Sequence, residues 1–310
     1  MSSISPTVPF SPPSTLAPAR TAVWQVAALV GVLGWAYLPM LRVFADKWIN
    51  DPQYSHGLLV PFFSAYLIWC AGRDGALALR PMPVVGCGLL VAILGLRAAA
   101  GAMLFHQLDA ASLLLALAAI ALAVGGLPLL KRVGPAIAFL IFMVPLPYEL
   151  ERNVGAPLKT AATVSSTYLL QTLGLPAIRD GNLILIDEVR LGVVDACSGL
   201  KMMVTFAAFS VGAVLLMQRS RFEKLMVLLG IVPVAVLTNV LRIAATGVSF
   251  AAIADKNTQD FLHDLYGWLM MPIGLALLAL EVWALKRLVV DDRELMDPAA
   301  LFAQPAPRPL

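Results

Sequence analysis

Long apolar runs dominate the chain and limit the kind of fold that it can adopt. From about residue 22 to residue 288, apolar runs alternate with short polar or charged segments. Hydrophobic residues make up 60% of the 310 residues and charged residues 13%, against about 25% charged residues in soluble domains. A soluble core cannot enclose that much apolar surface. The composition therefore predicts an all-α polytopic membrane protein, with about 20 apolar residues for each span.

We count about eight transmembrane helices within one membrane domain, residues 21–290. The residues before it, 1–20, are rich in Ser, Thr and Pro and predict a disordered tail, and residues 291–310 predict a polar tail. The eight apolar runs cover residues 22–44, 57–71, 82–104, 110–130, 133–147, 197–217, 225–251 and 264–288.

The short loops indicate the orientation, because Lys and Arg concentrate in cytoplasmic loops. With both tails in the cytoplasm, the opposite short loops contain only Arg42, Lys47 and Lys256. The cytoplasmic segments then carry Arg20, Arg73, Arg80, Lys131, Arg132, Arg219, Arg221, Lys224, Lys286, Arg287 and Arg293.

The polar segment between the fifth and sixth runs, residues 148–196, predicts two extramembrane elements on the outer face. Residues 149–173 have apolar side chains at helical spacing, which is typical of an amphipathic helix on the membrane surface. Residues Leu183–Ile186 and Val189–Val194 are short β-like runs around Asp187–Glu188, which predicts a small β-hairpin.

Cys197 lies where this hairpin gives way to the sixth span. A thiol at a helix N-terminus is exposed to the positive end of the helix dipole, which favours the nucleophilic thiolate. Lys201, one turn later, shares the helix face of Cys197, and its ammonium group would either lower the thiol pKa or extend to the membrane interface. Ser198 is the next residue after Cys197. A small residue at the interface is the alternative interpretation. The other two cysteines, Cys70 and Cys87, lie in apolar runs and predict buried hydrophobic side chains.

Arg242 lies within the seventh span, where a charge costs about 3 kcal/mol on insertion scales and needs a partner or a wet cavity. Asn239, three residues earlier, shares its helix face. A structural ion pair or a snorkelling side chain would satisfy Arg242. As a functional group, it would stabilise an oxyanion.

His263 and Asp264 lie at the outer start of the eighth span, so this topology places His263, Cys197 and Arg242 toward one membrane face. A histidine beside a cysteine is the expected general base and acid, although a solvated histidine is the simpler interpretation. His56 faces the same compartment from the second span, and Arg97 in the third span is a further candidate for the same cavity.

Several function classes are disfavoured. The chain lacks a basic stripe with interleaved aromatic residues and a phosphate-binding loop, which predicts no nucleic-acid partner. Without an HExxH or CxxC pattern, no metal site is expected, and no organic cofactor is needed. The GxSxG elbow of serine hydrolases is also missing.

Five motifs, in this order along the chain, resemble those of the exosortase family: "YSHGLLVPFFSAYLIW", "MVPLP", "DACSGLKMM", "TNVLRI" and "HDLYGWL". The resemblance covers roughly residues 45–285, and within the family we favour the type B exosortases. It implies a membrane-embedded cysteine protease or transpeptidase whose catalytic Cys, Arg and His are Cys197, Arg242 and His263.

The resemblance also implies the location and the substrates. The protein would lie in a bacterial inner membrane among lipids, with its site facing the periplasm. Its substrates would be exported proteins with a PEP-CTERM signal, in which a Pro-Glu-Pro motif precedes a transmembrane helix and a basic cluster. The acceptor and the oligomeric state stay open.

Two other functions remain as alternatives. A membrane transporter would use the intramembrane charges as a translocation path, although we find no inverted repeat. A non-catalytic scaffold of an exopolysaccharide or protein export system would bind partners without needing Cys197.

Overall fold

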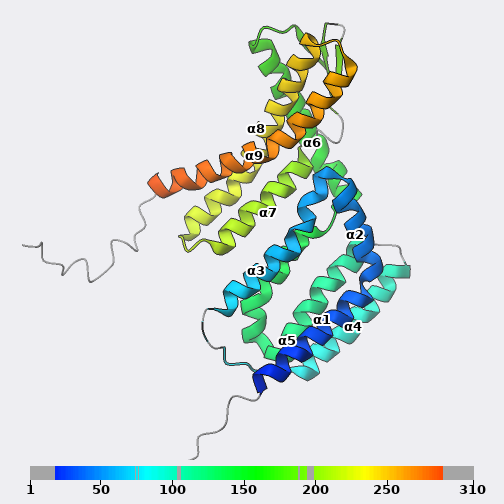
Figure 1. The fold of residues 1–310 in the computed structure, drawn as a ribbon, viewed down its shortest axis with the longest axis vertical. Helices are drawn as coiled ribbons and strands as arrows, with labels where there is room; N and C mark the ends of the chain where they lie inside the picture. Colours follow the sequence, from blue (N-terminus) through cyan, green and yellow to red (C-terminus); the bar gives the residue numbers. More distant parts are fainter. Residues whose placement is uncertain are drawn as a thin grey trace, which may run out of the picture. The chain divides into compact units, whose positions relative to one another are not determined.

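The structure is a computed structural model that describes residues 18–73, 75, 77–102, 106–187, 189–193 and 199–288. The chain forms two compact units, which we describe separately. The described residues of the first unit lie within Met1–Val43 and Arg73–Ile137, and those of the second lie within Phe44–Gly72 and Ala138–Leu310. Figure 1 shows the helices and strands along the chain.

The first unit contains α1 (Pro18–Ala36), the start of α2 (Leu38–Asn50), α4 (Pro83–Ala102) and nearly all of α5 (His106–Phe139). The single span predicted over residues 22–44 is instead two helices, since Ala27–Ala36 and Leu38–Asn50 are bent by 74°. Pro39 explains the break, because its ring clashes with the carbonyl of the residue four positions earlier and it has no N–H.

α5 contains the predicted fourth span and the first part of the predicted fifth span, whose residues 140–147 lie beyond it, and the helix has two arms. Gly126 separates them with φ 69° and ψ −163°, outside helical geometry. A Cβ at Gly126 would overlap the carbonyl oxygen of Arg80, and the Arg80 N–H donates to Gly125 O at 3.1 Å. Glycine is therefore required here both by the left-handed backbone and by the close approach of the preceding loop.

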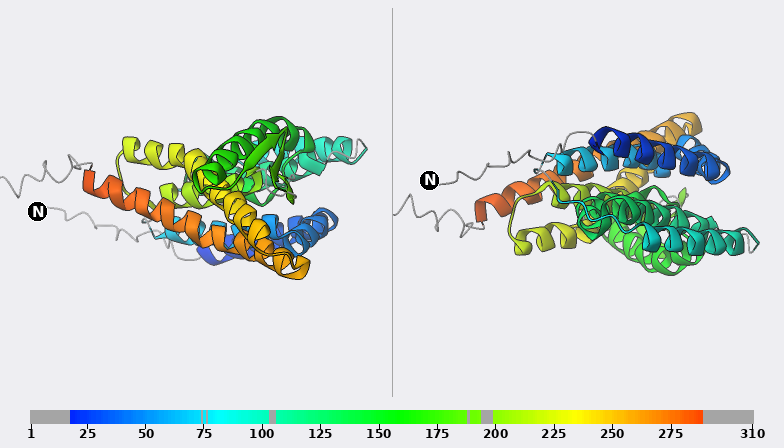
Figure 2. Two further views of the ribbon diagram at one scale, coloured as in Figure 1. Left: turned by 90° about the horizontal axis from the view of Figure 1, so that it is seen from above. Right: turned by 90° about the horizontal axis from the view of Figure 1, so that it is seen from below.

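The second unit contains the rest of α2 and most of the other elements. α8 is its central helix and packs against α6, α7 and α9. Figures 1 and 2 show α8 (yellow) and α9 (orange) running side by side. The elements are η1 (Pro52–Leu58), α3 (Val60–Gly72), η2 (Leu140–Met143), α6 (Tyr148–Thr172), β1 (Ala177–Asp180), β2 (Leu183–Ile186), β3 (Val189–Gly192), α7 (Leu200–Leu216), α8 (Arg221–Ala252) and α9 (Lys256–Leu288).

The predicted amphipathic helix is confirmed as α6. It buries a face of small and polar residues, and the Ser166 hydroxyl donates to Val240 O of α8 at 3.4 Å. The position of α6 on a membrane surface stays a prediction.

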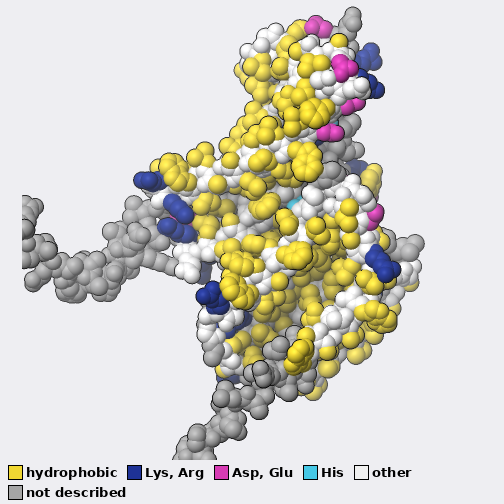
Figure 3. Space-filling model, viewed as in Figure 1, with side chains coloured by type: hydrophobic (Ala, Val, Ile, Leu, Met, Phe, Trp, Pro, Cys, Tyr) yellow, Lys and Arg dark blue, Asp and Glu magenta, His cyan; other side chains and the backbone are white. Residues whose placement is uncertain are grey.

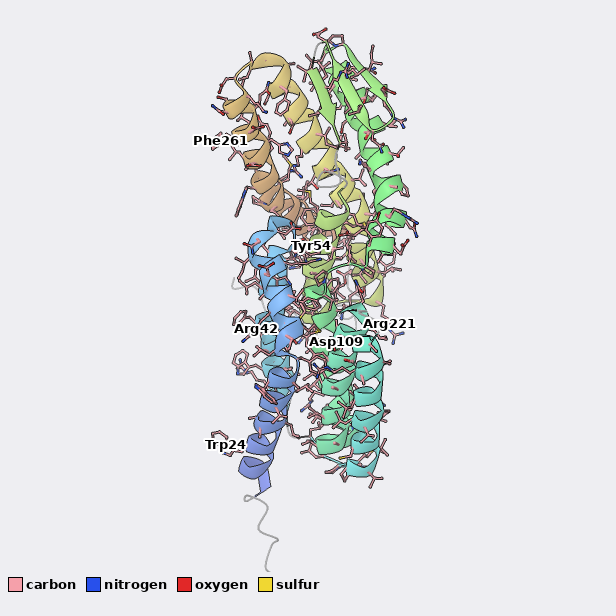
Figure 4. All side chains as sticks on the ribbon, turned by 90° about the vertical axis from the view of Figure 1, so that its right-hand side faces the viewer. Trp24, Arg42, Tyr54, Asp109, Arg221 and Phe261 are labelled. Carbon is pink, nitrogen blue, oxygen red and sulfur yellow. The ribbon has the colours of Figure 1, made fainter. Side chains whose placement is uncertain are left out.

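The predicted hairpin is confirmed as β2 and β3, and a third strand, β1, precedes it. The strand order is β1-β2-β3 with both pairs antiparallel. The sequence did not indicate β1, because only Ala177 of its four side chains is buried and no alternation is visible. One face of the sheet is buried against α6 and α8, and Figure 4 shows the strands beside these helices. The buried sheet residues are Ala177, Ile184, Ile186, Leu191 and Val193.

Many large apolar side chains are exposed, which is expected of a surface that faces lipid. Trp24 on α1 and Phe261 on α9 project outward in Figure 4. In Figure 3, hydrophobic side chains cover much of the surface over α8 and α9. Acidic side chains gather at the upper end of the second unit in that view, beside the sheet and the α8–α9 turn.

Among the described residues, three helical stretches are long and apolar enough to cross a membrane, or four if the bent pair α1–α2 counts as one span. The other predicted spans coincide with shorter apolar helices. Eight spans therefore stay a prediction. The three stretches are Gln107–Met143, Arg221–Ala252 and Lys256–Leu288, and the shorter helices are Val60–Gly72, Pro83–Ala99 and Met202–Leu216.

Gly126→Ala is expected to destabilise the protein by about 2 kcal/mol or more, because a side chain disfavours the left-handed backbone and meets the Arg80 carbonyl. Thermal unfolding of the purified protein in detergent measures the change. Gly134→Ala is the matched control on the same helix, since a Cβ there meets nothing within 4 Å. The control should be neutral or stabilising by up to about 1 kcal/mol. Equal stability of the two variants would contradict the assignment of Gly126.

Candidate active site

Arg242 and His263, from neighbouring helices, line one small cavity. Arg242 is only 8% exposed. The cavity has a volume of about 20 Å³, which is room for about one water molecule. The end of the sheet closes its other side. Its lining consists of Leu191, Gly192, Val193, Arg242, Ile243, Thr246 and His263.

The turn between α8 and α9 brings these two side chains together. Ser249 and Tyr266 share a hydrogen bond of 2.7 Å between their hydroxyls, and Gln259 Nε2 donates to Ile253 O at 2.6 Å. Asp255 precedes α9 and accepts hydrogen bonds from the hydroxyl and the backbone N–H of Thr258, which lower the pKa of its carboxyl group. The turn is therefore held by side chains from both helices.

Gly267 sets how closely α9 approaches Arg242. A Cβ at Gly267 would lie 3.2 Å from Arg242 Nη2 and 3.6 Å from Cζ. The guanidinium group thus packs directly over the glycine backbone, and a larger residue would displace it.

Asn239 connects α8 to the start of α7. It is 1% exposed, and a Cβ at Gly199 would lie 3.1 Å from its Nδ2. Gly199 is the N-cap residue of α7 with φ 76°, a left-handed conformation that favours glycine. Because Asn239 is three residues before Arg242, the two side chains lie on the same face of α8.

His56 is buried in η1 against α7, where its Nδ1 and the Thr205 hydroxyl lie 3.0 Å apart. The next residue, Gly57, packs against the ring of Trp48, whose Nε1 donates to Met143 O at 3.0 Å. His56 is thus fixed in a packed frame. It is not among the residues that line the cavity of Arg242 and His263.

Tyr54, two residues before His56, holds the same segment from the other side. Its hydroxyl donates to Glu151 of α6. Burial, followed by the hydrogen bond and the negative charge of Glu151, raises the pKa of the Tyr54 phenol above its usual range. The phenol therefore stays a neutral donor.

Arg97 belongs to a separate network in the first unit. Its Nε donates to Asp109 Oδ1 at 3.1 Å. Its Nη2 donates at 2.6 Å to the carbonyl oxygen of Ala36, which is the last residue of α1. Its guanidinium carbon lies 3.9 Å from the centre of the Tyr37 ring. These contacts hold the bend between α1 and α2.

Four other residues were predicted to belong to the site: Cys197, Ser198, Lys201 and Asp264. Asp264 is exposed on α9. Cys197 and Ser198 lie outside the described residues, and Lys201 belongs to α7 but its side chain is not described. Within the described part of the chain, no group of three or more His, Cys, Asp or Glu side chains is arranged to hold a metal ion.

Sequence reasoning missed Thr205, which pairs with His56, and it missed Gly192 and Gly267, which lie near Arg242. Thr205 had a signal, because it is a polar residue inside an apolar run. Gly267 ends the HDxxG piece of the quoted motif, but its role depends on Arg242 from another helix. For Gly192, nothing in the sequence indicated a role in the cavity beyond its position in a short strand.

The fold and this site define a helical membrane protein with a small cavity that Arg242 and His263 line together with the end of the sheet. The family model described as Transmembrane exosortase (Exosortase_EpsH) matches residues 48–280, which is more than half of the chain. The protein therefore belongs to the transmembrane exosortase family, whose members are generally transpeptidases or proteases. No curated protein and no solved structure shows a match to the chain.

Thr205→Val is expected to destabilise the protein by about 1–3 kcal/mol, because it removes a hydrogen bond from the buried His56 ring. Thermal unfolding in detergent measures the loss. Thr238→Val is the matched control, since Thr238 is equally buried but donates only to carbonyls of its own helix, Val234 and Ala235. Similar losses in the two variants would show that the contact with His56 does not stabilise the fold.

Proposed function

We propose that the protein is a membrane-embedded cysteine protease or transpeptidase that acts at the outer face of the bacterial inner membrane. One observation carries this proposal. The segment that contains Cys197 follows Val193, which lines the cavity of Arg242 and His263, and precedes Gly199, which lies against Asn239.

Chain length limits how far Cys197 can be from this site. Two residues of chain, the separation between Cys197 and Gly199, span at most about 7 Å. Of the described residues that flank this segment, Val193 lines a cavity with Arg242, and Gly199 lies against Asn239 on the same face of α8. This arrangement supports a reactive thiol beside a guanidinium group and an imidazole.

The proposed reaction has two steps of acyl transfer. The Cys197 thiolate attacks a backbone carbonyl carbon of the substrate, and Arg242 stabilises the oxyanion that forms. The C–N bond then breaks as His263 donates a proton to the leaving amine, which leaves a thioester on Cys197. In the second step, His263 takes the proton of water or an amine acceptor, which attacks the thioester and releases the thiolate.

Other residues have supporting roles in this proposal. Asn239 positions the start of α7, and His56 stabilises the same helix through Thr205. Ser198, Lys201 and Asp264 remain candidates beside the catalytic residues. The contacts of Arg97, all within the first unit, support a structural role there.

We infer the substrates and the topology from the family and the charge pattern. The substrates are exported proteins with a PEP-CTERM-type signal, cut just outside their transmembrane helix. Eight spans place both tails in the cytoplasm and the catalytic residues toward the periplasm, in agreement with the distribution of Lys and Arg. Within the family, the type B exosortases remain our proposal.

The proposal predicts that Cys197→Ala, Arg242→Ala and His263→Ala each lower processing of a reporter by at least about 100-fold, because each removes a group that acts in the transition state. The reporter ends in Pro-Glu-Pro, an apolar helix and a basic cluster, and it is co-expressed with the full chain. Its mass is followed in membranes. An acyl adduct on Cys197 should be trapped in the wild type.

Cys87→Ala is the matched control, because its thiol is exposed on α4 of the first unit, contrary to the burial that the sequence predicted. It should process the reporter as the wild type does. Processing that persists in Cys197→Ala would contradict the thiol mechanism and favour a scaffold or a transporter.

Gly267→Ala is expected to lower processing by about tenfold or more while the thermal stability changes little. The new methyl group meets the far end of the Arg242 side chain, which moves by a few tenths of an ångström at small energetic cost, but an oxyanion donor requires accurate placement. Reporter processing and thermal unfolding are measured together. Gly88→Ala, where a Cβ meets nothing within 4 Å, is the control. Wild-type processing by Gly267→Ala would contradict the role of Arg242 as a positioned donor.

A further inference from the structure

β3 has an open edge on the side away from β2. In an antiparallel pair, the N–H and C=O groups of alternate residues point toward the partner strand and away from it. The Val193 N–H donates to Asn182 O at 3.0 Å, so Val193 and, by alternation, Leu191 and Val189 face β2. Arg190 and Gly192 therefore direct their backbone groups to the other side.

Among the described residues, no further strand pairs with this side of β3. In the described sheet β3 is an outer strand, and α8 packs on the buried face, where Ile243 and Ala244 belong to the same hydrophobic cluster as Leu191 and Val193. Arg190 is exposed and Gly192 is half-buried. Two residues of β3 thus present backbone donors and acceptors along an edge.

The opposite edge of the sheet is partly closed by the chain itself. Ala177 of β1 faces away from β2, but its N–H donates to Leu175 O at 2.8 Å and its carbonyl accepts from Gln171 Nε2 at 2.8 Å. Natural sheets commonly block edges in this way, because unpaired strands attract other strands. Within the part of the chain that the structure describes, the backbone groups of Arg190 and Gly192 have no such contacts, so we treat the β3 edge as the accessible one.

The open edge leads directly into the candidate active site. Gly192 belongs both to the edge and to the lining of the cavity that contains Arg242 and His263. A chain that paired with β3 would therefore reach the cavity with its backbone extended. The absence of a side chain on Gly192 leaves the backbone open to a close neighbour.

We propose that the extended segment of the substrate beside the scissile bond adds to β3 as a fourth strand. This inference rests on the proposed function and specifies how the substrate is held. Pairing of main-chain groups binds an extended peptide with little dependence on its side chains, which suits an enzyme with several substrates.

A segment with proline at alternate positions fits such an edge. Every second residue of the added strand directs its N–H away from β3, and proline is tolerated on an outer strand at those positions. The Pro-Glu-Pro spacing of the proposed substrates has this pattern, with the glutamate backbone facing β3.

Replacement of an edge donor by proline tests the inference. Arg190→Pro removes an N–H that β2 does not use, so the hairpin should persist while reporter processing falls by about tenfold, the effect of one lost hydrogen bond. Arg179→Pro is the matched control, since Arg179 lies on β1 with its backbone directed away from β2. Arg179→Pro should process the reporter within about twofold of the wild type.

A third variant separates backbone from side chain. Arg190→Ala keeps the N–H and should process the reporter at least about threefold faster than Arg190→Pro. Equal losses in these two variants would assign the effect to the guanidinium group and overturn strand pairing. Wild-type processing by Arg190→Pro, or an equal loss in Arg179→Pro, would also overturn it.

Disulfide crosslinking tests the pairing without requiring activity. Arg190→Cys is introduced in a chain that also carries Cys70→Ala, Cys87→Ala and Cys197→Ala, and single cysteines are scanned along the reporter. Crosslinks at every second reporter position are expected, because side chains of a strand alternate between faces. Crosslinks with no periodicity, or between two copies of this chain, would overturn the inference.

The two assays distinguish failure of the inference from failure of the proposed function. If the wild type does not process the reporter but the periodic crosslinks form, the edge binds substrate and the proposed chemistry is wrong. If the wild type processes the reporter and no periodic crosslinks form, the chemistry stands and strand addition is wrong.

Discussion

The burial of Arg242 within α8 is the constraint around which the second unit is organised. A guanidinium group in an apolar helix requires polar surroundings, and the fold supplies them by packing α8 against three other helices. Gly267 lets α9 approach the guanidinium group, and His263 lines the same cavity. On the same face of α8, Asn239 meets the N-cap of α7. A polar site is therefore built along one helix face.

A second arginine in a predicted span has a different role, because its surroundings differ. Arg97 binds Asp109 and the carbonyl of Ala36, where the chain between α1 and α2 bends by 74°. A bend exposes carbonyl groups at the end of a helix, and a cation satisfies them well. Both arginines would be singled out from the sequence as intramembrane charges, but only their contacts separate a structural residue from a candidate catalytic one.

The small sheet joins the segment after α6 to the helices of the second unit. Its buried face is anchored on α6 and α8, so β3 is held with its C-terminal end at the cavity. Because the chain continues from there toward Cys197 and α7, one rigid element fixes both the open strand edge and the start of the segment with the thiol. Substrate binding and acyl transfer would then share a single scaffold.

From the sequence we could predict the class of protein, the approximate positions of most helices, the β2–β3 hairpin and the family. These follow from apolar run length, local alternation and short motifs, which are properties of neighbouring residues. The sequence did not reveal the bend after α1, the strand β1, the pairing of His56 with Thr205 or the cavity that Arg242 shares with His263 and Gly192. Each of these depends on contacts between segments distant in the chain, and in β1 a single buried side chain leaves no local pattern to read. Helix propensity and hydropathy place a residue along its own helix, whereas its partner is set by how neighbouring helices pack.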